Sequence, residues 1–202
     1  MIIKKIIKLS LLGVGQFGKV YKAINKKTKE KRAIKVMDIN EDEEIFMKNI
    51  TNEIKNMIIC SYENDNSVKI YEYFHYKDKD ELINKFVIVM ELCDNSLQKI
   101  LDNKKGGFSI KEIYNIMNQL NNTFKIMNKN KIIHRDIKLE NIVVKINKEK
   151  KEIRYKLTDY GMSKQLMDTI GKSYVGTPWL QKYLKEKEEE KRNMMKNVIY
   201  GV

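Results

Sequence analysis

The sequence contains little cysteine, proline or arginine. Its 202 residues include two cysteines, one proline and one tryptophan. Cys60 and Cys93 lie far apart and have no metal-ligand partners near them, which argues against a disulfide framework and for a reducing compartment. No apolar run approaches the roughly 18 residues that a membrane span requires, and lysines interrupt the apolar start of the chain. We therefore expect an intracellular protein, cytoplasmic or nuclear, with no membrane partner.

The excess of basic residues does not predict a dedicated nucleic-acid site. The net charge is +13, but only four of the 40 basic residues are arginine. The lysines are spread over the whole length, and no patch combines arginine with aromatic side chains. We interpret most of the lysines as solvated. A polyanion-binding module remains an alternative, and its binding would fall steeply with salt.

The composition permits a folded core, because 42% of the residues are hydrophobic. The length fits one ordinary domain or two small lobes that share a cleft. Hydrophobic periodicity predicts strands at residues 6–24, 32–37, 68–76 and 85–92, and helices near 50–58, 96–101 and 109–127. Ser109 and Glu112 have the spacing of a capping box at the start of the long helix. The apolar stripe expected to be buried on that helix is Ile113, Ile116, Met117, Leu120, Phe124 and Met127.

The most informative stretch is His-Arg-Asp-Ile-Lys-Leu-Glu-Asn at residues 134–141. It is followed at once by the β-branched run Ile-Val-Val, so the spacing suits a loop around one reaction centre that enters a buried strand. Asp136 could accept a hydroxyl proton, Lys138 could neutralise phosphate charge and Asn141 could reach a metal. The stretch resembles the catalytic loop of the eukaryotic protein kinases. The resemblance makes Asp136 and Lys138 catalytic and Asn141 a metal ligand.

A glycine-rich turn lies near the start of the chain. A G-x-G-x-x-G pattern alone also serves dinucleotide folds and plain turns, but here it leads into a strand, as in a hairpin flap. Glycines let backbone N–H groups approach phosphates without interference from a Cβ. The turn resembles the kinase glycine-rich loop. The resemblance implies nucleotide contacts from Leu12, Gly13, Val14, Gly15, Gln16, Phe17, Gly18, Lys19 and Val20.

Lys35 lies in the apolar strand Ala-Ile-Lys-Val that follows the flap. This position matches the kinase lysine that holds the α- and β-phosphates of ATP. A buried lysine needs a counter-charge. Glu53 shares a face with the apolar stripe of the next helix, and we expect it to pair with Lys35.

The segment 86–95 resembles the kinase hinge. On that resemblance Met90 is the gatekeeper, and backbone groups of Glu91 and Cys93 pair with the adenine edge. Ala33 and Val143 complete the implied nucleotide site. Cys93 has no evident activating base, so we expect a structural role for its thiol rather than a reactive one.

Asp159-Tyr160-Gly161 is the second strong motif. It resembles the kinase magnesium-binding motif, in which most members have phenylalanine where this chain has Tyr160. The substitution keeps the aromatic side chain and adds a hydroxyl. The resemblance implies that Asp159 and Asn141 hold Mg²⁺ ions that bridge the phosphates of ATP.

Residues 162–178 resemble an activation segment. Ser173 lies four residues before Thr177, where many relatives are phosphorylated. We expect an upstream activating kinase to act at Ser173, with Arg135 receiving the phosphate. Beyond Trp179 the family's Ala-Pro-Glu anchor and the remaining helices are missing, which fits either a truncated sequence or a genuine short protein.

These observations predict an α+β, two-lobed protein-kinase-like fold whose β-rich N-lobe is complete and whose helical C-lobe is truncated. The expected domain covers residues 8–202, with the N-lobe at about 8–91, the hinge at 91–95 and a partial C-lobe at 96–202. The expected function is ATP- and Mg²⁺-dependent phosphorylation of serine and threonine in protein substrates. Lys138 and Thr177 favour these hydroxyls over tyrosine. The alternative is an inactive nucleotide-binding scaffold or kinase fragment.

Overall fold

The structure is a computed structural model, and it describes residues 6–15, 18–39, 43–62, 64–77, 84–161 and 164–165. The chain divides into two compact units, Met1–Gln165 and Leu166–Val202. All the described residues belong to the first unit, and the second unit lies outside them.

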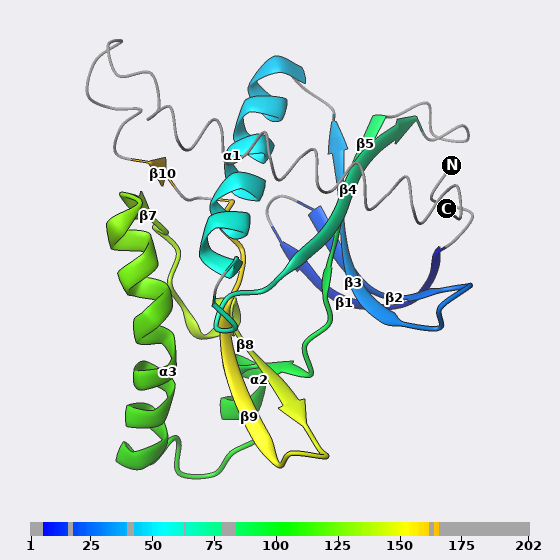
Figure 1. Ribbon diagram of the computed structural model, residues 1–202. Coiled ribbons are helices and arrows are strands. Elements are labelled where there is room, and N and C mark those ends of the chain that lie inside the picture. Colours follow the sequence, from blue (N-terminus) through cyan, green and yellow to red (C-terminus); the bar gives the residue numbers. More distant parts are fainter. Residues whose placement is uncertain are drawn as a thin grey trace, which may run out of the picture. The chain divides into compact units, whose positions relative to one another are not determined.

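Five antiparallel strands form the first sheet (Figure 1). Their bounds are β1 (Ile6–Gly15), β2 (Gly18–Asn25), β3 (Lys31–Ile39), β4 (Ile70–Lys77) and β5 (Asn84–Glu91), in the order β1-β2-β3-β5-β4. The central strands β3 and β5 are apolar runs buried on both faces, as expected for the middle of a sheet. Helix α1 (Glu43–Ser61) contacts β4 and supplies one wall of the core.

The described chain after β5 contains the helices α2 and α3 and two small sheets. The elements are β6 (Asn95–Ser96), α2 (Leu97–Asp102), α3 (Ile110–Lys129), β7 (Ile132–Ile133), the 3₁₀ turn η2 (Leu139–Asn141), β8 (Ile142–Asn147), β9 (Glu152–Leu157) and β10 (Lys164–Gln165). Strands β6, β8 and β9 form one sheet, and β10 pairs with β7. The loop 134–141 therefore lies between the strand β7 and the hairpin β8–β9.

Helix α3 begins with the predicted capping box. The Ser109 hydroxyl accepts a hydrogen bond from the Glu112 backbone, and the Glu112 carboxylate accepts one from the Ser109 backbone N–H. The stripe predicted on this helix is partly wrong: Ile113 and Met117 are 49% and 53% exposed, whereas Thr123 is buried. Each residue turns the helix by about 100°. The side of α3 that packs on β9, β7 and α1 therefore carries Ile116, Leu120, Thr123 and Met127. This buried face is narrower than the predicted stripe and is rotated about the helix axis, away from Ile113 and Met117.

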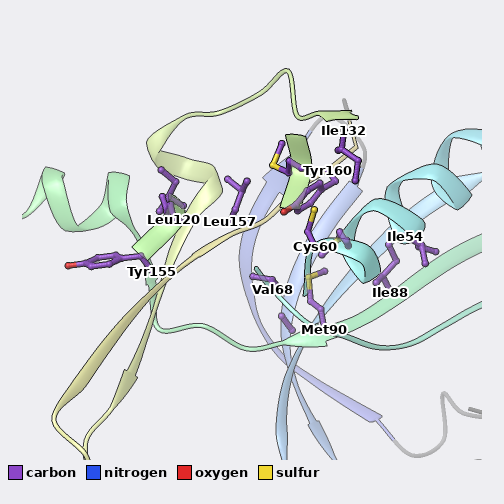
Figure 2. Close-up of a cluster of buried hydrophobic side chains, with 14 of the residues drawn as sticks. Ile54, Cys60, Val68, Ile88, Met90, Leu120, Ile132, Tyr155, Leu157 and Tyr160 are labelled. Carbon is purple, nitrogen blue, oxygen red and sulfur yellow. The ribbon is translucent and has the colours of Figure 1, made fainter. Parts of the chain in front are cut away.

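One continuous apolar core joins the sheet, α1 and the elements around α3. Figure 2 shows part of it, with Ile54, Met90 and Val68 on one side and Leu120 and Leu157 on the other. A second, smaller cluster on β2, β3 and β5 contains Ala23, Ile34, Val36, Val87 and Val89. Within the described ranges, no helix is long and apolar enough to cross a membrane.

Candidate active site

The predicted pair of Lys35 and Glu53 is present in the structure. The Lys35 ammonium on β3 lies 2.7 Å from a Glu53 carboxylate oxygen on α1 and 3.3 Å from a carboxylate oxygen of Asp159. Lys35 and Glu53 are buried. Burial acts to lower the pKa of Lys35, but the charges of Glu53 and Asp159 outweigh it and raise that pKa. Lys35 is therefore held as a buried cation at neutral pH.

The residues of the loop 134–141 form a second cluster. The Asp136 carboxylate lies 2.9 Å from the Lys138 ammonium and accepts a 2.9 Å hydrogen bond from the Asn141 side-chain amide. The Lys138 hydrogen bond lowers the pKa of Asp136, and the Asn141 bond acts in the same direction against the effect of burial. Asp136 is thus ionised and able to accept a proton. Because the Asn141 nitrogen is used by Asp136, its side-chain oxygen is the atom left to meet a cation.

The two clusters are joined by backbone contacts. The Thr158 N–H donates a 3.0 Å hydrogen bond to the Asn141 carbonyl, so the residue before Asp159 is fixed to the loop 134–141. The Thr158 carbonyl lies 3.1 Å from Nε2 of the buried His134, which supports the start of the same loop. Asp159 itself has a left-handed backbone, with φ of 59°. Such a conformation in a residue other than glycine persists where its surroundings hold it in place.

A cavity of about 520 Å³ lies between the first sheet and the elements after β5. Its size is within the range usual for small-molecule sites. Of the residues predicted to bind nucleotide or metal, the cavity is lined by Leu12, Gly13, Val14, Gly15, Val20, Ala33, Lys35, Glu53, Met90, Glu91, Cys93, Asn141, Val143 and Asp159. Gly18 and Lys19 are not among the lining residues, and Gln16 and Phe17 lie outside the described residues. Asp136 and Lys138 are not among the lining residues either, but Asp136 is hydrogen-bonded to the lining residue Asn141, and Lys138 pairs with Asp136.

Gly18 has a packing role that the sequence did not indicate. Its φ is +140°, and a Cβ placed on it would lie 2.3 Å from the backbone carbonyl oxygen of Val36. Gly13, by contrast, has open space around such an atom. The third glycine of the turn is therefore required for the approach of β2 to β3, whereas Gly13 is not required for packing.

Several residues at the cavity and the hinge are not among those predicted from the sequence. Met57 follows Glu53 by one helical turn, so the helical period could have predicted that both side chains line the cavity. Lys99 donates a 3.2 Å hydrogen bond to the Leu12 carbonyl across the cavity mouth, and no sequence signal marks it. Lys145 and Lys156 also carry no such signal, although both bind the hinge. The Lys145 ammonium donates a 2.6 Å hydrogen bond to the Leu92 carbonyl, and Lys156 pairs with the Glu91 carboxylate.

The thiol of Cys93 is not activated. Burial raises the pKa of Cys93 to about 12, and the nearby charge of Glu91 acts in the same direction. The thiol is therefore protonated at neutral pH, which agrees with the expected structural role.

The donor set fits Mg²⁺ and a triphosphate. Asp159 and Asn141 supply hard oxygen atoms, which are the ligands that Mg²⁺ prefers, and Lys35 supplies a fixed positive charge for phosphate oxygens. Among the described residues, no group of three or more His, Cys, Asp or Glu side chains is arranged to hold a metal ion. A Mg²⁺ ion at this site would take its remaining ligands from phosphate oxygens and water, as is usual for that ion.

The predicted activation segment lies largely outside the described residues, and Ser173 and Thr177 are among those outside. The described part is β10, in which Lys164 and Gln165 pair with Ile133 and Ile132 of β7. Arg135, the expected phosphate receiver, is exposed next to Asp136.

A five-stranded sheet that meets a helix-containing region at a cavity, with Lys35, Glu53, Asp159 and Asn141 lining that cavity, is the architecture of a protein kinase. Residues 6–198 match the protein kinase domain, and the chain belongs to this family. The predicted protein-kinase-like fold is thereby confirmed.

The relatives of the chain include known protein kinases. Calcium-dependent protein kinase 5 of Plasmodium falciparum is 35% identical over 171 residues, which cover 83% of this chain and 28% of that protein. Serine/threonine-protein kinase mig-15 of Caenorhabditis elegans is 34% identical over 179 residues, covering 85% of this chain and 15% of that protein. Misshapen-like kinase 1 of Rattus norvegicus is 35% identical over 176 residues, which cover 85% of this chain and 12% of that protein. The chain thus spans less than a third of the length of these relatives.

Proposed function

We propose that the chain transfers the γ-phosphoryl group of ATP to serine and threonine hydroxyls of protein substrates. The observation that carries this proposal is the double pairing of Lys35, whose ammonium lies 2.7 Å from Glu53 and 3.3 Å from Asp159. It places a buried cation and a carboxylate side by side in the cavity that also contains Asn141. That combination matches what a magnesium–nucleotide complex needs.

The adenine would bind between apolar side chains that line the cavity from both sides. These are Leu12, Val20, Ala33, Met90 and Val143. Lys35 would then meet the α- and β-phosphates, and because Glu53 and Asp159 fix its ammonium, little ordering remains to be done when the nucleotide binds.

Asp159 and Asn141 would hold Mg²⁺. When bound there, the ion neutralises negative charge on the phosphate oxygens. Asn141 donates its amide hydrogen to Asp136, which orients the side-chain oxygen of Asn141 away from that carboxylate.

Asp136 would orient the substrate hydroxyl and accept its proton. The hydroxyl oxygen forms a bond to the γ-phosphorus while the bond from that phosphorus to the bridging oxygen of ADP breaks. Lys138 keeps Asp136 ionised and lies 2.9 Å from it, so the same ammonium can also steady the phosphoryl group in transfer.

The preference for serine and threonine rests on two sequence positions. Lys138 stands two residues after the catalytic aspartate, and tyrosine-directed members of the family usually lack lysine there. Thr177 supports the same assignment from the predicted activation segment. The name of the relative mig-15, a serine/threonine-protein kinase, agrees with it.

We also propose that an upstream kinase phosphorylates Ser173 and that Arg135 receives the phosphate, which would order the segment around it. Ser173→Ala should lower activity after treatment with an activating kinase. Unchanged activity would contradict this part of the proposal.

The test of transfer is an assay with radiolabelled ATP and Mg²⁺ on the purified chain beside Asp136→Asn, with a generic basic protein as acceptor. With the parent, acid hydrolysis of the acceptor protein is expected to yield labelled phosphoserine and phosphothreonine. With the variant, labelling is expected to fall by at least about a hundred-fold because the proton acceptor is gone. Labelled tyrosine alone would contradict the assigned hydroxyl class. Nucleotide binding without any transfer would favour the scaffold alternative.

A further inference from the structure

The hydroxyl of Tyr160 has a specific partner in the core. Tyr160 and Ser67 are each 0% exposed, and their hydroxyl oxygens lie 3.0 Å apart, sharing one hydrogen bond. Figure 2 shows Tyr160 next to Cys60 of α1. Burial raises the pKa of Tyr160 well above its ordinary value, so the phenol stays protonated.

Ser67 is held in place by backbone bonds to the strand that leads to Tyr160. The Val68 N–H donates to the Leu157 carbonyl at 3.0 Å, and the Leu157 N–H donates to the Asn66 carbonyl at 2.9 Å. Ser67 and Leu157 thus form a parallel bridge. The position of the Ser67 hydroxyl relative to residues 157–160 is therefore set by main-chain contacts.

Asp159 lies between two fixed neighbours. On one side, Thr158 is bound to the Asn141 carbonyl and to His134. On the other side, the Tyr160 ring lies 4.7 Å from the ring of His134, and its hydroxyl binds Ser67. The left-handed backbone of Asp159, with φ of 59°, needs such support on both sides.

We propose that Ser67 is a positioning residue for Asp159, acting through the Tyr160 hydroxyl. The ring of Tyr160 fills its pocket by shape alone, as a phenylalanine would, but the hydroxyl adds a directional bond that fixes how far the ring enters. That bond sets the distance between Asp159 and Lys35. The proposal rests on the proposed function in assigning Mg²⁺ to Asp159.

Removal of the Ser67 hydroxyl should displace Asp159. The buried phenol of Tyr160 then lacks the partner that offset its removal from water, and this penalty is relieved if Tyr160 leaves the pocket. Asp159 would move with it and lose its place beside Lys35. A phenylalanine at position 160 carries no such penalty, so the loss of the Ser67 hydroxyl should then have no effect.

The experiment is a double-mutant cycle of Ser67→Ala and Tyr160→Phe, with Ser61→Ala as the matched control. Ser61 is also buried, but its hydroxyl donates to the Ile58 carbonyl of its own helix. The first readout is the affinity for a fluorescent ADP analogue, measured in Mg²⁺ and in EDTA. Ser67→Ala should weaken the binding in Mg²⁺ about ten-fold, the effect of one lost buried hydrogen bond, and leave the binding in EDTA unchanged.

In the Tyr160→Phe background, Ser67→Ala should change the affinity in Mg²⁺ by less than about two-fold, because the coupled partner is already gone. An equal loss in both backgrounds, or a loss of the same size in Ser61→Ala, would overturn the proposal.

The second readout needs no nucleotide. Nitration of Tyr160 by tetranitromethane, located by mass spectrometry, reports whether the ring has left its pocket. Tyr160 should be protected in the parent and labelled in Ser67→Ala, and equal protection in both would overturn the proposal. If the parent bound no nucleotide at all, the proposed function would fail, and the nitration result would still decide the role of Ser67.

Discussion

The Lys156 ammonium on β9 lies 3.0 Å from the Glu91 carboxylate at the end of β5, and the two side chains are 3% and 14% exposed. A buried pair of this kind joins the hinge to the hairpin β8–β9. Breaking it by removing one partner leaves a buried charge without compensation.

Lys156→Met should therefore destabilise the chain by about 3–5 kcal/mol. The measurement is the free energy of unfolding in urea. Lys156→Met combined with Glu91→Gln should recover most of this loss, because no buried charge is then left alone. A loss below about 1 kcal/mol in the single variant, the value typical of surface pairs, would contradict the buried pairing.

Lys35→Met should abolish nucleotide binding and also destabilise the fold, because Glu53 would remain buried without its cation. The double variant Lys35→Met with Glu53→Gln separates the two effects. It should regain stability in urea but not nucleotide affinity. Recovery of both properties would show that Lys35 has no direct role in binding.

Two glycines of the flap should respond differently to alanine. Gly18→Ala places a Cβ 2.3 Å from the Val36 carbonyl oxygen and forces a φ that alanine avoids. We expect a loss of about 1–3 kcal/mol in the free energy of unfolding. Gly13→Ala, at a position with open space, is the control and should change stability by less than about 1 kcal/mol. Equal losses would contradict the packing role of Gly18.

The buried His134 predicts a pH dependence. Burial lowers the pKa of His134, against a weaker opposite effect of its bond to the Thr158 carbonyl. Among the described residues its Nδ1 has no hydrogen-bond partner, so a second ring proton would be buried unpaired. The unfolded chain therefore binds this proton more readily than the folded chain. The stability contributed by the neutral ring is present above about pH 6.5 and lost as the pH falls below it.

Unfolding free energies of the parent should decrease between pH 7.5 and pH 5.5, by at most about 1.4 kcal/mol per pH unit from this one group. His134→Phe should remove that part of the slope. The matched control is His75→Phe on the exposed side of β4, which should keep the slope of the parent. An unchanged slope in His134→Phe would contradict the assignment.

The sequence predicted the ion pair of Lys35 and Glu53 but not the ion pair of Lys156 and Glu91 at the hinge. Lys35 and Glu53 could be paired because a lysine in an apolar strand and a carboxylate on an apolar helix face both need a counter-charge. Lys156 could not be recognised in the same way. It lies in the strand Ile-Arg-Tyr-Lys-Leu, where polar and apolar residues alternate like those of a half-exposed strand, and only the fold shows that its side chain meets Glu91.

Helix α3 is a second element that the sequence predicted only in part. Its capping box was predicted correctly because it depends on residues three apart in the chain. Its buried face was predicted only in part. Ile116, Leu120 and Met127 are buried as expected, but Thr123 is buried through hydrogen bonds to Asn64 and Asn66, which come from a distant loop. Likewise, the Tyr160 hydroxyl was visible in the sequence, but its partner Ser67 lies 93 residues away and carries no local signal.

The most direct test of the proposed site is a calorimetric titration of the purified chain with ATP, in Mg²⁺ and in EDTA, beside Asp159→Asn. We predict binding that Mg²⁺ strengthens in the parent and a loss of that strengthening, though not of all binding, in the variant. Binding that is unaffected by Mg²⁺ in the parent, or equally strengthened in the variant, would contradict the placement of the metal at Asp159.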